Sequence, residues 1–261
     1  MAATITETVS TGSSAPLPGL VAAQLEELEQ KGYVVIPGAL SREEVERCRV
    51  ALNEARAQGL EEGLNSVGNM WFDHLLEQMP EVFSPLVAHP SMRPQLDELF
   101  GPQCQMRSLR AHINPGPYLQ EWHMDFYSYW HQPLKARYAV RGTGINTTFY
   151  FQDNGPGIAR LTFLKDGHRV PPPEHLFTQN GHTGDHDAFE AWCYAQEQET
   201  IYPKAGDAVL FFSHIPHQGA KEDPGVERSN VVCHYQVNPF FHGVVHVSST
   251  AGGNGVFPLA G

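Results

Sequence analysis

The sequence has few cysteines, few basic residues and no long hydrophobic run, and each shortage excludes a class of protein. Its four cysteines include no CxxC pair, so a zinc-type cluster is not expected, and a reduced intracellular setting explains them most simply. There is no run of about 18 apolar residues, so no transmembrane helix is expected. The N-terminus lacks the basic and apolar regions of a secretory signal, which predicts a cytoplasmic protein.

The charge balance is acidic. The chain of 261 residues carries 17 Lys and Arg against 29 Asp and Glu, which gives a net charge of −12. Nucleic-acid-binding proteins need a basic surface, and anionic membranes repel acidic proteins, so neither partner is expected. The predicted partner is a small-molecule substrate. Histidine, by contrast, is plentiful, with 14 residues, and it is the commonest side chain that binds transition metals.

The first part of the chain is expected to be helical. Residues 1–18 are rich in Ser, Thr, Ala, Gly and Pro and are predicted to form a flexible arm before a single domain over 19–261. Apolar residues at helical spacing predict a helix over 20–31 that ends at Gly32, followed by a short buried strand from Tyr33. Ser41 and Glu44 have the spacing of a capping box, which predicts a helix from there to about Gly59. A further helix is expected at 92–100.

From residue 105 onward the pattern changes to short runs of β-branched and aromatic residues. These runs are 105–113, 145–151, 161–164, 200–202, 208–212 and 229–237. Gly, Pro, Asn and Asp separate them, which predicts a mainly β fold, a sandwich or jelly roll, with flanking helices. Residues 170–199 interrupt the pattern with a proline run, His and Asp residues and a short helix near 189–196. Because so long a connection is usually functional, this segment is predicted to be a substrate lid.

The clearest local feature is the tripeptide His123-Met124-Asp125. On a strand, residues two apart point to the same face, so His123 and Asp125 project together while Met124 points away. A histidine and a carboxylate on one face are two of the three ligands of the facial triad of non-haem Fe(II), which leaves positions for a 2-oxo acid and O2. The tripeptide is common by chance, and the alternative is a His–Asp pair on a sheet surface.

The third iron ligand is expected late in the chain, after an apolar strand. His214 and His217 both follow the predicted strand 208–212. Arg228 favours His217, because it lies eleven residues beyond it at the start of the strand 229–237. There its guanidinium would bind the far carboxylate of 2-oxoglutarate with two hydrogen bonds. The alternative role of Arg228 is a surface salt bridge with a neighbouring acid, Glu222, Asp223 or Glu227.

With these residues, the chain resembles the phytanoyl-CoA dioxygenase family of Fe(II)- and 2-oxoglutarate-dependent oxygenases, from about residue 30 to 240. The resemblance rests on Gly32-Tyr-Val-Val-Ile-Pro-Gly, Trp122-His-Met-Asp, Asn154-Gly-Pro-Gly and Gly206-Asp, followed by His217 and Arg228. It implies a double-stranded β-helix, a cupin-like jelly roll with helices on one outer face. It also implies that His123, Asp125 and His217 bind Fe(II), that Arg228 binds 2-oxoglutarate, and that O2 is the oxidant.

Two positions differ from the family pattern. The segment Lys165-Asp-Gly-His stands where the family has a Pro-Gly-Ser-His-like tetrapeptide, so a role for His168 is carried over only weakly. Two residues after the distal His, the family often has a Ser or Thr that binds the cosubstrate carboxylate, but this chain has Gly219. Another hydroxyl is therefore expected to take its place, and the candidates are Thr162, Thr148 and Tyr150.

The presence of Asp125 also indicates which product to expect. Related halogenases carry a small residue at that position to admit chloride, so this chain is expected to hydroxylate or desaturate a small natural product or lipid-like metabolite.

For several other residues, a role in the site and a purely structural role both remain open: Phe126, Tyr127, Tyr129, Trp130, Arg137, Arg141, His112 and the cluster 182–187. Two rival functions are a cupin-type metalloenzyme that does not use 2-oxoglutarate and a non-catalytic jelly-roll binding protein.

Overall fold

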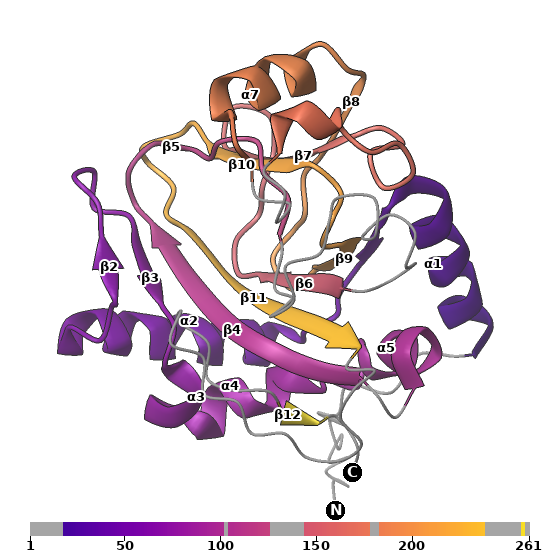
Figure 1. Cartoon of the computed structure of the whole chain (residues 1–261). Coiled ribbons are helices and arrows are strands. Elements are labelled where there is room, and N and C mark those ends of the chain that lie inside the picture. The colour runs from indigo at the N-terminus through magenta and orange to yellow at the C-terminus, as the bar shows by residue number, and fades with distance from the viewer. Residues whose placement is uncertain (1–17, 102–103, 126–143, 178–182, 238–256, 259–261) are drawn as a thin grey trace, which may run out of the picture.

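The computed structural model describes residues 18–101, 104–125, 144–177, 183–237 and 257–258, which form two antiparallel sheets flanked by helices (Figure 1). The larger sheet, of eight strands, has the order β1 (Tyr33–Ile36), β9 (Ala208–Phe212), β6 (Gly144–Tyr150), β11 (Arg228–Val237), β4 (Cys104–Asn114), β3 (Met70–Phe72) and β2 (Gly63–Leu64), with β12 (Phe257–Pro258) also beside β4. The smaller sheet has the order β5 (Tyr118–Leu119), β10 (His217–Lys221), β7 (Ala159–Leu164) and β8 (Gln198–Ile201). The predicted class, mainly β with flanking helices in a jelly roll, is confirmed.

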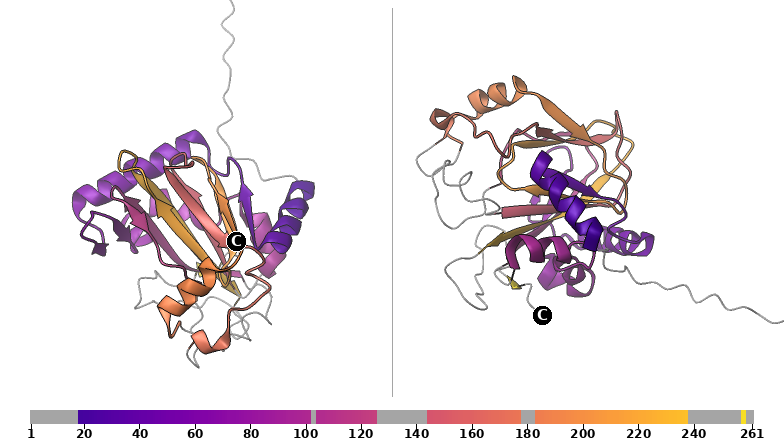
Figure 2. Two further views of the ribbon diagram at one scale, coloured as in Figure 1. Left: turned by 90° about the horizontal axis from the view of Figure 1, so that it is seen from above. Right: turned by 90° about the vertical axis from the view of Figure 1, so that its right-hand side faces the viewer.

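The helices lie on two sides of the strands. They are α1 (Pro18–Lys31), α2 (Arg42–Gln58), α3 (Leu75–Gln78), α4 (Pro80–Val87), α5 (Arg93–Phe100) and α7 (His186–Tyr194), with a short 3-10 turn η2 (Glu174–Leu176). Figure 1 shows α2, α3, α4 and α5 beneath the larger sheet, and the right-hand view of Figure 2 shows α7 on the opposite side of the strands. None of the helices that the structure describes is long and apolar enough to cross a membrane.

Most predicted elements are present. The capping box between Ser41 and Glu44 begins α2, and Gly59 ends it in the left-handed conformation. The first helix starts at Pro18, so it takes the last residue of the predicted arm, and residues 1–17 lie outside the described part. Pro at the start of a helix loses no hydrogen bond, which explains the earlier boundary. The prediction missed the short elements α3, α4, β2, β3, β5 and β10, whose sequences are too brief for a periodic pattern.

Alternation along β11 divides the molecule into a core and a cavity. Val231, Cys233 and Tyr235 are buried in a hydrophobic cluster with α2, α4 and α5. The alternate residues, Arg228, Asn230, Val232 and His234, line a cavity on the other face. The neighbouring strands β4 and β6 alternate in the same way, so one face of the sheet stabilises the fold through apolar burial while the other carries polar side chains.

The end of α1 packs on the loop that precedes β10. Gly32 has a φ of 83°, and a Cβ at this position would lie 2.6 Å from His168 Nδ1 and 2.8 Å from the Ile215 side chain. The Glu29 carbonyl, in the last turn of α1, accepts hydrogen bonds from His168 Nε2 at 3.0 Å and from Arg169 Nη2 at 2.5 Å. His168, the doubtful match to the family tetrapeptide, therefore caps a helix.

The described parts of 170–199 are packed onto the segment that carries His123. Phe189 and Cys193 of α7 are fully buried and cluster with Trp122. The Trp122 backbone N–H also donates to Glu190 Oε1 at 3.0 Å. A lid over 170–199 and a single domain over 19–261 both stay predictions. The four cysteines are buried and free.

Candidate active site

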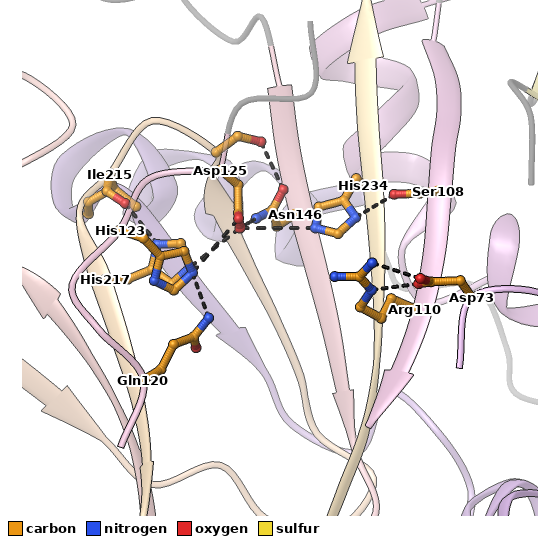
Figure 3. Close-up of polar contacts among 11 residues, drawn as sticks. Asp73, Ser108, Arg110, Gln120, His123, Asp125, Asn146, Ile215, His217 and His234 are labelled. Carbon is orange, nitrogen blue, oxygen red and sulfur yellow. Dashed lines mark hydrogen bonds and ion pairs between the residues drawn. The ribbon is translucent and has the colours of Figure 1, made fainter. Parts of the chain in front are cut away.

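Three predicted iron ligands come together in a cavity of about 170 Å³ that both sheets line. One ligand atom from each of His123, Asp125 and His217 lies within 4.8 Å of the other two. The carboxylate is 3.8 Å from His123 Nε2 and 3.4 Å from His217 Nε2 (Figure 3). Two imidazoles and a carboxylate at this spacing are the donors of a facial triad. Among the described residues, no other group of three or more His, Cys, Asp or Glu has such a spacing.

The segment that carries His123 is not a regular strand. His123 forms an isolated antiparallel bridge with His217, in which each backbone N–H donates to the other residue's carbonyl. The predicted alternation still holds, because Trp122 and Met124 are buried in the α7 cluster while His123 and Asp125 line the cavity. This bridge brings the two histidines together from segments far apart in the chain.

Backbone carbonyls orient both imidazoles. Nδ1 of His123 is 2.9 Å from the Glu121 carbonyl, and Nδ1 of His217 is 2.9 Å from the Ile215 carbonyl. Since a carbonyl only accepts, each Nδ1 carries the proton and each Nε2 keeps its lone pair toward the cavity. In His123 that lone pair accepts a hydrogen bond from the Gln120 amide at 3.0 Å. Both rings are therefore in the tautomer that binds a metal through Nε2.

The charges of the site also suit a metal. Burial, together with the neighbouring His217, lowers the pKa of His123 to about 4. Burial alone would raise the pKa of Asp125, but the His217 imidazole 3.4 Å away, with His123 beside it, holds that pKa well below its usual range. A neutral imidazole and an ionised carboxylate are the forms that coordinate a divalent cation.

A ring of hydrogen bonds fixes the Asp125 carboxylate. Asn146 is fully buried on β6, and its amide donates to Asp125 Oδ2. The amide oxygen of Asn146 accepts from the Ser213 hydroxyl at 2.8 Å, and the Ser213 carbonyl accepts from the Asp125 N–H at 2.7 Å. His234 Nε2 lies 4.0 Å from the same Oδ2. Because these contacts gather on one oxygen, Oδ1 is the atom turned toward His123.

Arg228 begins β11 and lies in the same cavity as the triad. Its side chain donates to Asn114 Oδ1 at 3.0 Å, and its guanidinium carbon is 5.6 Å from the ring centre of Tyr118 and 6.0 Å from that of Tyr150. The residue is 7% exposed, and among the described residues no carboxylate lies within 4.0 Å of it. A surface salt bridge is not its role, since Glu222 pairs with Arg160 and Glu227 with Arg56.

The three residues predicted to supply a hydroxyl to the cosubstrate do not all lie on strand faces that line the cavity. Thr148 and Tyr150 on β6 line the cavity beside Arg228. Thr162 does not reach it, because its neighbours Leu161 and Phe163 face inward and its own hydroxyl lies 3.0 Å from that of Thr200 on β8. Thr162 is therefore corrected to a residue of the outer face.

The space where the family often has a Ser or Thr side chain borders Arg228. A Cβ on Gly219 would lie 3.6 Å from Arg228 Nη2, 3.6 Å from the Tyr118 ring and 3.3 Å from the Gln120 amide oxygen. Tyr118 thus stands beside the position of the missing hydroxyl, and its phenol was not among the candidates from the sequence.

His214 is held away from the triad. Its Nε2 lies 3.0 Å from the His168 carbonyl. Asp185, from the cluster 182–187, has a structural role, because it caps α7 by accepting from the Ala188 N–H. His112 lines the cavity and lies 3.1 Å from Asn230 Oδ1. The remaining doubtful candidates, Phe126, Tyr127, Tyr129, Trp130, Arg137, Arg141 and His182, lie outside the described residues.

Several residues of the site were missed from the sequence, among them Arg110, Gln120 and His234, which line the cavity, and Asn146, which holds Asp125. For some of them, spacing along the strand could have indicated the position, because residues an even number apart share one face. Asn146 shares its face of β6 with Thr148 and Tyr150, and His234 shares its face of β11 with Arg228.

Comparison with known proteins gives one family match. A model of the phytanoyl-CoA dioxygenase family matches residues 28–223. Among curated protein sequences, no significant match to the chain was found.

Solved structures of similar fold include oxygenase-type proteins from several sources. The α-ketoglutarate-dependent epimerase SnoN from nogalamycin biosynthesis is 18% identical, over 85% of this chain and 82% of its own, with a TM-score of 0.65. EctD from S. alaskensis, with 2-oxoglutarate and 5-hydroxyectoine, is 17% identical over 87% and 78%, with a TM-score of 0.63. HygX from Streptomyces hygroscopicus, with nickel and 2-oxoglutarate, is 15% identical over 89% and 93%, with a TM-score of 0.59. At these identities the likeness establishes the fold.

Proposed function

Because this chain belongs to the phytanoyl-CoA dioxygenase family of iron- and 2-oxoglutarate-dependent oxygenases, we propose that His123, Asp125 and His217 bind its Fe(II) and that Arg228 binds the distal carboxylate of 2-oxoglutarate. The reaction oxidises a small molecule, with hydroxylation as the proposed outcome. When bound, the iron activates O2 as 2-oxoglutarate loses CO2 and becomes succinate.

The residues of the site serve this reaction by orientation. The Glu121 and Ile215 carbonyls keep both imidazoles in one tautomer, so no proton has to leave Nε2 before metal binds. Asn146, which is itself positioned by the Ser213 hydroxyl, holds one carboxylate oxygen of Asp125 and leaves the other for the metal. Phe211 stacks edge-on against His217 at 4.8 Å and limits the movement of that ring. The chain thus supplies a preorganised set of three donors.

The observation that carries the assignment of 2-oxoglutarate is the state of Arg228. A buried guanidinium without a carboxylate partner is costly, because it has lost its hydration and gains only neutral contacts. An anion in the cavity removes that cost. A diacid whose other end lies at the triad supplies one, with Thr148 and Tyr150, and Tyr118 beside Gly219, as the neutral contacts around it.

Succinate formation tests this proposal. Purified protein with Fe(II), 2-oxoglutarate and O2 is expected to release succinate, even slowly without its substrate, and His217→Ala is expected to release none. A cupin-type enzyme that does not use 2-oxoglutarate would bind Fe(II) and make no succinate. A non-catalytic jelly-roll protein would do neither. Either of the last two results would overturn the proposal.

Product analysis decides the outcome of the chemistry. Asp125 stands where a halide would have to bind, which supports oxygen insertion. The similar proteins SnoN and SnoK are named as an epimerase and a carbocyclase, so isomers and products that have lost two hydrogens must also be measured. A reducing compartment such as the cytoplasm is also proposed, and the four buried free thiols support it.

A further inference from the structure

The wall of the cavity formed by β4 and β11 carries a second arginine. Arg110 lies opposite Val232 in the pairing of these strands, and Asn114, the hydrogen-bond partner of Arg228, lies opposite Arg228 itself. Both arginines line the same cavity as the triad. Positions 110 and 114 are four residues apart on β4, which is roughly 13 Å along the strand.

This backbone separation is about twice the length of 2-oxoglutarate, whose four C–C bonds of about 1.5 Å each span at most about 6 Å. A cosubstrate that joins the triad to Arg228 is therefore not expected to reach Arg110 as well. Figure 3 shows Arg110 on the far side of His234 from the three predicted iron ligands. This end of the cavity is therefore available to a second ligand, which binds together with the cosubstrate.

Arg110 is held in a fixed orientation. Its Nε and Nη2 donate to the two carboxylate oxygens of Asp73 at 2.5 Å and 2.7 Å. The Asp73 side chain is 4% exposed, whereas that of Arg110 is 34% exposed. A two-pronged pair of this kind fixes the plane of the guanidinium before any ligand arrives, which lowers the entropy lost on binding.

Among the described residues that line this end of the cavity, Arg110 carries a charge at every physiological pH, because a guanidinium does not lose its proton there. His112 lies on the same wall, and burial lowers its pKa to about 3. The Arg110 guanidinium lines the cavity that holds the triad, and its side chain stays 34% exposed although Asp73 holds it. A cation that is fixed and accessible in this way is suited to binding an anionic ligand.

We propose that Arg110, held by Asp73, binds a carboxylate of the substrate, so that the enzyme acts on small organic acids. This inference rests on the proposed function, because it assumes that the cosubstrate occupies the Arg228 end. Arg110 then sets which part of the acid faces the metal, since the charged end is anchored beyond His234.

Matched acids and amides test the inference. Benzoate, 4-phenylbutanoate and octanoate would be titrated calorimetrically, each beside its primary amide, into protein loaded with Fe(II) and saturating 2-oxoglutarate without O2. The acids that fit are expected to bind at least about tenfold more tightly than their amides, because only the acid pairs with a guanidinium. If acid and amide bind equally throughout, or if more 2-oxoglutarate displaces the acids, the inference is overturned.

Substitutions test whether Arg110 is the residue responsible for the preference for acids over amides. Arg110→Gln alone leaves the buried Asp73 unpaired, so the test variant is Arg110→Gln with Asp73→Asn, which keeps shape and removes both charges. It is expected to bind acids as weakly as amides. The control neutralises a surface pair, Arg160→Gln with Glu222→Gln, and should keep the preference.

A preference for acids that survives the test variant would overturn the inference. Failure of the proposed function is distinguished by the unmutated protein, which would then bind no 2-oxoglutarate and release no succinate.

Discussion

Replacing Arg228 by methionine separates two effects of the native residue, its effect on the stability of the ligand-free protein and its effect on the affinity for 2-oxoglutarate. In the ligand-free protein, Arg228 is a buried cation whose described contacts are neutral, so methionine removes a desolvation cost while it keeps much of the packing. Replacing buried charges by apolar residues is often neutral or stabilising by about 1–4 kcal/mol, and the loss of the bond to Asn114 costs about 1 kcal/mol. The ligand-free variant is therefore expected to be as stable as the native protein or up to about 3 kcal/mol more stable.

The effect on cosubstrate binding has the opposite sign. Without Arg228, the distal carboxylate of 2-oxoglutarate is buried beside tyrosines and an asparagine with no cation, which costs about 3–5 kcal/mol. The dissociation constant should rise by a factor of hundreds to thousands. Arg228→Lys should recover only part of this loss, because an ammonium cannot form the two parallel hydrogen bonds.

Denaturant unfolding measures both effects in one assay. The free energy of unfolding would be determined with and without 2-oxoglutarate, using Ni(II) as a metal that does not turn over. The cosubstrate should stabilise the native protein and Arg228→Lys to different extents and leave Arg228→Met unchanged. A ligand-free Arg228→Met that is destabilised by more than about 2 kcal/mol, with undiminished affinity for 2-oxoglutarate, would refute the reasoning and make Arg228 a structural residue.

Four further outcomes are expected. His217→Ala should lose most bound Fe(II) in a metal titration, whereas His214→Ala should keep it, because its Nε2 contacts a carbonyl outside the triad; the reverse result would exchange the ligand assignment. Asn146→Ala should weaken Fe(II) binding about 10- to 100-fold, since Asp125 loses the amide that orients it, and unchanged affinity would contradict that role. In high chloride, mass spectrometry of the native product should show an added oxygen or the loss of two hydrogens; a chlorinated product would remove Asp125 from the iron ligands. Burial lowers the pKa of His112 to about 3, so below about pH 6.5 the unfolded chain binds a proton that the folded chain does not, and the free energy of unfolding should fall as the pH drops. His112→Asn should make the free energy of unfolding depend less steeply on pH, and an equal slope would exclude His112 as a cause.

The sequence was most informative where the spacing of candidate ligand residues matches the two-residue repeat of a β-strand. His123 and Asp125 are two residues apart, so a single period-2 argument placed both on one face, although the structure has only a bridge there. The choice of His217 over His214 came from its distance to Arg228 along the chain. Local pattern sufficed for these residues because each requirement is local.

Other parts of the site depend on pairing between distant segments, which a single sequence does not encode locally. Thr162 and Thr148 look alike in sequence, yet only Thr148 faces the cavity, because each strand's face is set by its neighbours in the sheet. The partnership of Asn146 with Asp125, and that of Asp73 with Arg110, joins segments whose approach follows from the whole fold. The short strand β10 was missed because its five residues, His217–Lys221, contain little apolar pattern.

The contact between Gly32 and the loop before β10 has a practical consequence for anyone who shortens this protein. Deleting α1 together with Gly32 would remove residues that do not line the cavity of the iron ligands, yet it would also release His168 and Ile215 from the surface that they contact. The Ile215 carbonyl orients the His217 ring, so a trimmed version could fold its sheets and still fail to retain iron. Metal content, measured beside thermal stability, is therefore the proper criterion for choosing where a recombinant version begins.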